Sequence, residues 1–427
     1  MSVNLDFFAR IRSDAMTTVS EINDPAELAA LSPVWSELWE RTPGASFFHS
    51  LTWLQIYWKH FGAGKRLRVL IVHDRGQVIG ILPLVVATAR RSEPFRALMY
   101  PLADWGNFYG PIGPAPQATL VAGLDHVRRT PRDWHFIDLA SVDALADKGH
   151  TKLALDSAGF VATCETPGIS AVVDLAAHGS WEAYLATRSG RLRALLRRRE
   201  KQLAKHGAVT YVRHRATESE GLHADPRWDL YDACENISRV SWQAKVRYGK
   251  AMVKATDRSF YRDCHVAAVR AGAADLNLLS VDGRPAAFLY CYHTRSCVTG
   301  LNFAYDPAFA SEGVGTIVLA RTLADSFARG DHTVDLGPNS TDRYKRRWLT
   351  DERPIYCYTH FPRGSAAARL VRAKRAMVRW WRTRRTAGAN GPYGAQVAEQ
   401  GVTSAAVTSN GTLDRGIAHD DVSTGEM

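Results

Sequence analysis

The segment 276–348 contains the residues whose types and spacing are best suited to chemistry. Gly313 and Gly315 stand in the first turn of an expected helix, where free backbone N–H groups and the helix dipole attract anions. Tyr344 and Lys345 follow an expected short strand, and a cation beside an aromatic ring can hold a phosphate or a developing oxyanion. A structural explanation stays open, because a single Gly-x-Gly is common at strand–helix joints and a basic turn is often only solvated.

The order of expected elements supports the chemical explanation. The sequence LNLLSVDGRPAAFLYCYH places two apolar runs around an Asp282-Gly283 turn, which predicts a hairpin. A third strand ends at Tyr305, the glycine-containing helix follows, and another strand runs from His332 to Leu336. A strand meander that leads into a glycine-rich helix start is suited to anion binding. We therefore expect four loop residues to contact an anionic donor: Ser311, Gly313, Gly315 and Thr316.

Two other segments carry ring-bearing and polar side chains that can hold an acceptor. One is the loop 101–115, which is rich in glycine, proline and aromatic residues, and the other is the stretch 241–245 between two expected helices. The acceptor candidates are Asp104, Trp105, Tyr109, Trp242 and Lys245. Packing explains the aromatic residues of the loop equally well, and it is the better explanation for Trp242.

The two halves of the chain repeat one order of elements. In the first, a helix with Trp53, Tyr57 and Trp58 precedes RVLIVHDRGQVIGILPLVV; in the second, a helix with Phe260 and Tyr261 precedes the hairpin described above. Each half reads as helix, strand, Asp/Gly turn and strand. This predicts a duplicated α+β unit, each copy a mixed, mostly antiparallel sheet flanked by helices. We expect a lead at 1–20 and two lobes at 21–176 and 177–362.

Length and composition narrow the class of protein. A chain of 427 residues suggests two or three domains. Its 46% apolar and 23% charged residues are typical of a soluble globular protein, and no apolar run approaches the roughly 20 residues of a membrane span. The start lacks the apolar core of a signal peptide, and the six scattered cysteines are expected to be reduced thiols. We expect a cytoplasmic protein without a metal, because no metal-ligand spacing is present.

The net charge of +11 is local. Arg188 to Lys205 holds eight basic residues and one acid, and Arg363 to Arg385 holds nine basic residues and no acid. The first segment belongs to an expected long helix, Trp181 to His206, whose arginines can face a polyanion such as tRNA or can simply be solvated. The second predicts an amphipathic helix on an anionic membrane surface, with packing on the domain as the alternative. The tail 386–427 is expected to be disordered.

Several motifs together resemble one family. They are SGRLRALLRRREKQL from Ser189, the tripeptide Ser241-Trp242-Gln243, VDGRPAAFLYCYH followed by YDPAFASEGVG, and DLGPNSTDRYKRRW from Asp335. Over about residues 30–362 the chain resembles GNAT-superfamily acyltransferases of the CelD/BcsL-like group of cellulose and exopolysaccharide biosynthesis. That group is itself similar to Fem-type aminoacyltransferases.

The resemblance implies two GNAT-like lobes and acyl transfer to an amine or hydroxyl of a glycan, lipid-linked or cell-envelope precursor. It implies an acyl-CoA donor and a splayed strand whose backbone polarises the acyl carbonyl, here Gly300, Leu301, Asn302 and Phe303. Lys345 matches a lysine that lies near the acyl donor in Fem-type enzymes. Asp335, Asp104 and Tyr344 are candidates for the base, and Tyr305 for the acid that protonates the leaving thiolate.

The donor loop departs from the family pattern. The position three residues before the first glycine usually holds Gln or Arg, but here it is Ala310, and Glu312 beside a pyrophosphate would be repulsive. The donor can therefore be acyl-CoA, an acyl carrier protein or an aminoacyl-tRNA. Two other functions stay open: aminoacyl-tRNA-dependent transfer, and a non-catalytic scaffold of a polysaccharide-synthesis complex.

Overall fold

The computed structural model describes residues 17–377 except 89–94, 103–105, 107, 218–220, 222, 246–251, 254–256, 341, 343 and 367. Its strands form one sheet in the order β1-β2-β3-β4-β5-β12-β6-β11-β10-β9-β8-β7. The strands are β1 (Thr17–Ile22), β2 (Arg66–Asp74), β3 (Gln77–Thr88), β4 (Arg96–Met99), β5 (Phe136–Asp143), β6 (Ala162–Asp174), β7 (Val209–Arg215), β8 (Ala274–Val281), β9 (Arg284–Thr294), β10 (Cys297–Tyr305), β11 (Thr333–Pro338) and β12 (Asp351–His360).

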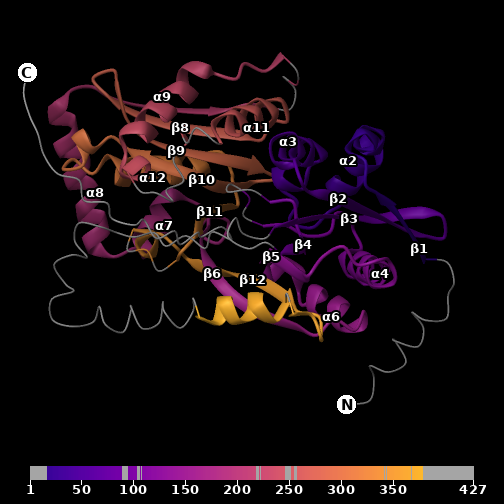
Figure 1. The fold of residues 1–427 in the computed structure, drawn as a ribbon. Helices are drawn as coiled ribbons and strands as arrows, with labels where there is room; N and C mark the ends of the chain where they lie inside the picture. The colour runs from indigo at the N-terminus through magenta and orange to yellow at the C-terminus, as the bar shows by residue number, and fades with distance from the viewer. Residues whose placement is uncertain are drawn as a thin grey trace, which may run out of the picture.

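Helices cover both faces of this sheet (Figure 1). The α-helices are α2 (Ser32–Glu40), α3 (Leu51–Phe61), α4 (Pro116–Arg129), α5 (Ala144–Asp147), α6 (His150–Ser157), α7 (Trp181–Thr187), α8 (Gly190–Leu203), α9 (Trp228–Val240), α10 (Trp242–Lys245), α11 (Arg258–Arg270) and α12 (Val314–Ala328). In the second lobe α7, α8 and α12 share one apolar core with Leu279 and Leu289, while α9 and α11 pack on the opposite face against Leu278 and Tyr290. The predicted two-lobe α+β fold is confirmed.

The two lobes repeat a motif in which a helix connects two parallel strands. In the first lobe α4 joins β4 to β5, and in the second α12 joins β10 to β11. Every other strand pair of the described sheet is antiparallel. This is the duplication that the two Asp/Gly hairpins indicated.

The lobes exchange their last strands. β6 is the last strand of the first lobe in the chain but pairs with β11 of the second, and β12 is the last strand of the second lobe but pairs with β5 of the first. β6 and β12 also pair with each other, so the sheet runs through both lobes without a break. Across the helical layer, Phe260 of α11 packs on Trp53 and Phe61 of α3. Neither lobe completes its own sheet without the other.

Two local expectations differ from the structure. The expected helix 181–206 is broken at Arg188, which is extended, and Ser189 then caps α8 by accepting a hydrogen bond from the Leu192 N–H. Strand β1 begins at Thr17, within the segment expected to be an irregular lead. Its partner is β2, and such a long-range pairing leaves no local signal in the sequence.

Residues 368–377 form a C-terminal helix, shown in yellow next to β12 in Figure 1. Val371 is buried against Ala97 and Phe136 of the first lobe. Arg375 donates from Nη2 to Asp138 Oδ2 of β5 at 2.9 Å. One side of this helix therefore packs on the protein. For that side the structure agrees with packing on the domain, which was the alternative to a membrane contact. Residues 378–427, including the expected disordered tail, lie outside the described part. No helix among the described residues is long and apolar enough to span a membrane.

Candidate active site

The site forms where β10 and β11 separate. The two strands pair in parallel from Cys297–Thr333 to Thr299–Asp335, and β10 then continues to Tyr305 without this partner. A register shift between Gly300 and Asn302 bends β10 where the separation begins. A side chain at Gly300 would lie 3.1 Å from the Asp335 carbonyl oxygen, so glycine lets the strands approach before they part. The separation falls within the segment 299–303 that the resemblance designates as splayed.

The open edge of β10 presents backbone groups to the gap. Gln243 of α10 donates from Nε2 to the Phe303 carbonyl oxygen at 3.0 Å. The N–H and C=O of one strand residue point to the same side, so the Phe303 N–H also faces away from β9. An N–H in this position can donate to the oxygen of an acyl carbonyl, which carries negative charge in the transition state.

Lys345 places an ammonium group at the point where the strands part. It starts the short 3-10 turn η6 (Lys345–Arg347), is only 5% exposed, and donates to the carbonyl oxygens of Gly337 and Pro338 at the end of β11. Gly337 has φ +82°, and a Cβ there would lie 3.6 Å from the Gly300 carbonyl oxygen and 3.8 Å from Lys345 Nζ. The charge therefore lies at the base of the gap, where it can stabilise an oxyanion or a leaving group.

Asp335 offers a buried carboxylate beside this ammonium. Its Oδ1 accepts hydrogen bonds from Ser170 Oγ at 2.5 Å and from the Gly337 N–H at 2.7 Å. Its Oδ2 is buried without a hydrogen bond, and Arg353 Nη1 of β12 is 3.8 Å away. Burial raises the pKa of Asp335 above its ordinary value, which brings it nearer to the range of a general base.

Arg353 connects the Asp335 carboxylate to the first lobe. Its Nη1 lies 3.7 Å from Asp143 Oδ2 of β5, and its guanidinium lies over the Phe108 ring at 5.4 Å. Its Nε is buried without a hydrogen bond. Phe108 of the first lobe therefore lies near the splayed strands of the second, and the exchanged strand β12 carries the residue that connects them.

The two tyrosine candidates lie on the other side of β10. Tyr344 stacks on Phe303 with ring centroids 5.8 Å apart, and desolvation raises its pKa above the ordinary value. A tyrosine with a raised pKa stays protonated near neutral pH, which argues against Tyr344 as the base. The Tyr305 ring lies against Gly315, where an added Cβ would be 3.3 Å from Tyr305 Cδ1 and 2.9 Å from Phe303 Cζ. Gly315 therefore allows α12 to pack closely on β10.

The donor loop already contains charged side chains. Arg199 of α8 donates to the Ser311 carbonyl oxygen, and a Cβ at Gly313 (φ +70°) would lie 2.9 Å from Arg199 Nε. Ser311 Oγ donates to Glu312 Oε1 at 2.8 Å, which lowers the pKa of Glu312. Thr316 bonds through its N–H to the Gly313 carbonyl oxygen at 2.9 Å. An ionised carboxylate thus stands at the N-terminus of α12, where a pyrophosphate would bind.

The acceptor candidates are divided. Tyr109 is buried and its ring stacks on His49 at 5.2 Å, so it packs in the first lobe instead of lining an open surface. Trp242 is 39% exposed beside Gln243, which corrects the expectation that it belongs to the core. The Lys245 side chain, together with all of Asp104 and Trp105, lies outside the described residues.

Sequence reasoning missed the residues that position the candidates. Arg353 and Ser170 come from the exchanged strands β12 and β6, and Arg199 comes from a helix of the same lobe. The contacts of Ser170 and Arg199 join positions more than 100 residues apart, and only Arg199 lies in a motif that the sequence marked. Gln243 had a signal, because it adjoins Trp242 in the quoted tripeptide. Among the described residues no cluster of histidine, cysteine, aspartate or glutamate could hold a metal ion.

Comparison with known proteins agrees with this geometry. A family model described as an acetyltransferase (GNAT) domain matches residues 190–346, which include the splayed strands and Lys345. No curated protein matches the chain. The solved structure of FemX is 12% identical, with a TM-score of 0.51, over 80% of this chain and 96% of that one. The structure of L-PGS from Bacillus licheniformis is 13% identical, with a TM-score of 0.50, over 84% and 99%.

At such identities the two structures show a shared fold, whereas the family match concerns the sequence itself. Residues 190–346 thus match a GNAT-type acetyltransferase domain, and the protein is a transferase.

Proposed function

We propose that the second lobe transfers an acyl group from an activated donor to an amine or hydroxyl of a glycan, lipid-linked or cell-envelope precursor. One observation carries the proposal. The open edge of β10, the Lys345 ammonium and the unpartnered oxygen of Asp335 meet where β10 and β11 part. These are an oxyanion donor, a positive charge and a base, which acyl transfer without a covalent enzyme intermediate requires.

The reaction follows from these groups. The acceptor nitrogen or oxygen forms a bond to the acyl carbon, and Asp335 Oδ2 takes the proton that the acceptor loses. The Phe303 N–H and the Lys345 ammonium stabilise the negative charge on the carbonyl oxygen. The bond from the acyl carbon to the leaving sulfur or oxygen then breaks, and the leaving group takes a proton from Tyr305.

The donor is proposed to be acyl-CoA, the donor that the GNAT resemblance implies. The Glu312 carboxylate supports a second candidate, an aminoacyl-tRNA, because its ester does not require a pyrophosphate at α12. The helix α8 contacts Ser311 through Arg199, and its exposed arginines could bind a polyanion such as tRNA. The glycan or cell-envelope acceptor comes from the resemblance to the exopolysaccharide group. A lipid-linked acceptor would place the protein at the inner face of a membrane.

Thermal unfolding with each donor tests the proposal. We expect CoA and acetyl-CoA to raise the Tm of the wild type, and Glu312→Gln to strengthen this effect by removing a repulsive charge. If charged tRNA raises the Tm and CoA does not, the second donor replaces the first. Matched measurements on Glu352→Gln, an exposed carboxylate on β12, control for a general charge effect. If neither donor changes the Tm, both proposed donors are wrong, and an acyl carrier protein as donor or the non-catalytic scaffold replaces them.

A further inference from the structure

We infer that the C-terminal helix is a docking surface for an anionic lipid membrane, and that the cavity at its start holds a lipid phosphate. The inference rests on the part of the proposed function that locates the acceptor at a membrane. It does not depend on the donor or on the reaction.

Packing fixes which side of the helix faces outward. Ala368 and Val371 are each 1% exposed, and Arg375 is paired with Asp138. These positions follow the i, i+3, i+7 spacing of one helix face. The outward side therefore carries Leu370 and Met377, which are 61% and 56% exposed. Two large apolar side chains seven residues apart form a stripe that no described part of the protein covers.

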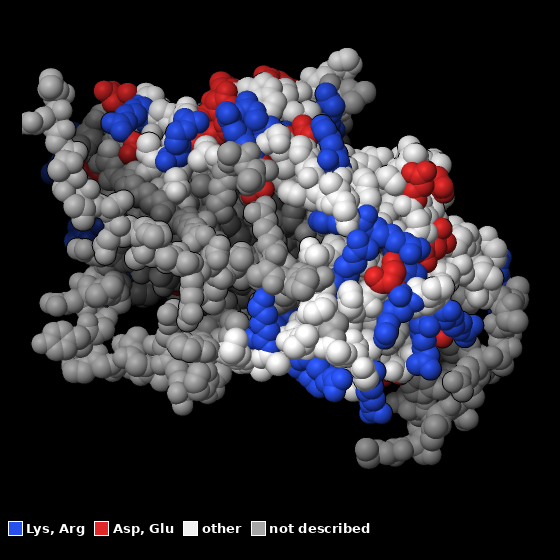
Figure 2. All heavy atoms as spheres, in the orientation of Figure 1, with Lys and Arg blue, Asp and Glu red and all other residues white. Residues whose placement is uncertain are grey.

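The outward side is also basic. Arg363, Arg369, Arg372 and Lys374 are exposed, and the segment 361–377 contains no acidic residue. Figure 2 shows basic side chains, in blue, where this helix crosses the lower part of the molecule. A helix with an apolar stripe between cations is suited to the boundary between lipid headgroups and acyl chains. A nucleic acid would attract the cations but would leave Leu370 and Met377 without a partner, so the combination favours lipid.

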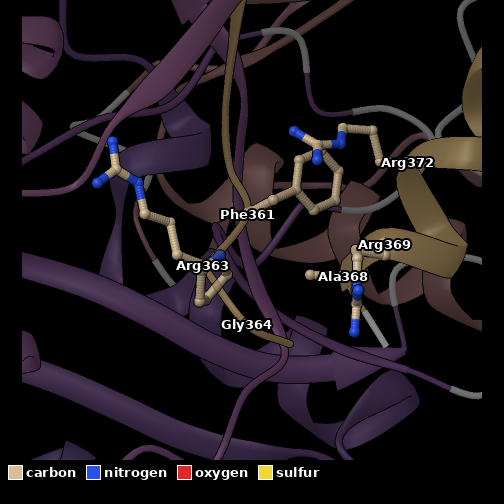
Figure 3. Close-up of a pocket in the computed structure, with 7 residues that line it drawn as sticks. Phe361, Arg363, Gly364, Ala368, Arg369 and Arg372 are labelled. Atoms are coloured by element: carbon tan, nitrogen blue, oxygen red, sulfur yellow. The ribbon is translucent and has the colours of Figure 1, made fainter. Parts of the chain in front are cut away.

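A cavity of about 220 Å³ opens at the start of the helix. It is lined by Phe361, Pro362, Arg363, Gly364, Ala368, Arg369 and Arg372. Figure 3 shows that these arginine side chains leave the turn and the helix in different directions, with Arg372 beside the Phe361 ring and Arg363 and Arg369 pointing away from it. Guanidinium groups bind phosphate through paired hydrogen bonds. An arginine at this cavity can therefore bind a lipid phosphate, while Leu370 and Met377 enter the lipid layer.

Co-sedimentation of the full chain with vesicles tests this surface. Phosphatidylcholine vesicles with and without phosphatidylglycerol are compared, and wild type is expected to sediment only with the anionic vesicles. The variant Arg363→Gln/Arg369→Gln/Arg372→Gln should bind them roughly 100-fold more weakly, because each cation near an anionic surface contributes roughly fivefold. The variant Arg191→Gln/Arg197→Gln/Arg198→Gln, with the same charge change on exposed positions of α8, should bind within about twofold of wild type.

The apolar stripe has its own matched pair. Leu370→Ser should weaken vesicle binding several-fold, whereas Leu145→Ser, at a position 60% exposed on α5, should not. Unchanged Tm values show that each variant is folded. Adding inorganic phosphate in the absence of lipid then tests whether the cavity binds a free anion instead of a lipid headgroup.

The outcomes separate the two claims. Failure of the wild type to bind anionic vesicles overturns both the membrane location and this surface. Binding by wild type and by the first triple variant alike overturns this surface and leaves the membrane location. Equal losses in the two triple variants would assign vesicle binding to net charge and would also overturn this surface. The surface is overturned as well if a saturating concentration of inorganic phosphate leaves vesicle binding unchanged.

Discussion

In both lobes two parallel strands pair over three positions and then separate, and in both the last pair contains an aspartate. The pair is Met99–Asp138 in the first lobe and Thr299–Asp335 in the second. Asp138 accepts a hydrogen bond from Thr359 at 3.1 Å and is paired with Arg375 at 2.9 Å. Asp335 keeps one oxygen without a hydrogen bond. Equivalent positions thus hold a fully partnered carboxylate in one lobe and an available one in the other.

The space where the two strands part also differs between the lobes. In the first lobe the buried rings of Tyr100 and Tyr109 pack 5.3 Å apart and His49 stacks on Tyr109. In the second lobe the gap has the Lys345 ammonium at its base and the Phe303 backbone at its edge. Aromatic packing fills the first gap, whereas the second gap has the groups that the proposed reaction uses.

Replacing the available carboxylate should have the largest effect. Asp335→Asn keeps the shape but cannot accept a proton, and loss of a general base lowers turnover by roughly 10²–10⁴-fold. The measurement is steady-state turnover of the folded variant with the donor found by thermal shift. Burial raises the pKa of Asp335, so the acidic limb of the wild-type rate profile should lie above the ordinary aspartate pKa. Turnover equal to wild type would remove Asp335 from the mechanism.

Lys345→Met should come next. The substitution keeps the length of the side chain and removes the charge at the base of the gap, so we expect turnover to fall about 10²–10³-fold. The exposed neighbour Arg346 gives the control. Arg346→Gln also removes one positive charge, but from an exposed position and not from the base of the gap. If both variants lose activity equally, the effect belongs to the basic turn as a whole.

Lowering the pH should destabilise the folded protein through His49, which packs in the gap of the first lobe. Burial lowers the pKa of His49 to about 4, so between pH 6.5 and 4 the unfolded chain binds a proton that the folded chain does not. Stability conferred by neutral His49 is full above pH 6.5 and is lost as the pH falls, by about 3 kcal/mol in all. Urea unfolding at pH 7 and pH 5 should show this loss, and His49→Gln should reduce it. An unchanged pH dependence in the variant would contradict the assignment.

The partnered aspartate should matter for stability alone. Asp138→Asn leaves Arg375 with a weakened partner and should lower the free energy of unfolding by about 1–3 kcal/mol. Turnover at a temperature where the variant is folded should stay that of the wild type. A variant that is stable but inactive would show that the first lobe takes part in the chemistry and would end the contrast between the two lobes.

Much of the local structure could be predicted from the sequence. The Asp282-Gly283 turn and the glycines at the start of the helix α12 depend on neighbouring residues, and the structure has both. The site candidates Asp335 and Lys345 were found because a strand end and a basic turn are visible in the sequence. The raised pKa of Tyr344 could not be predicted, because its desolvation depends on how Phe303 packs against it.

The sequence by itself determined the type of fold and the basic segments, because these follow from residue types and short spacings, while the splayed strand was expected from the family resemblance. Only the tertiary structure decided that β6 and β12 change places between the lobes, since strand pairing over long distances depends on the whole sheet. That exchange brings Ser170 and Arg353 to Asp335. It also brings Thr359 to Asp138, while the C-terminal helix adds Arg375. The partners, and with them the different roles of two equivalent aspartates, are therefore a product of packing.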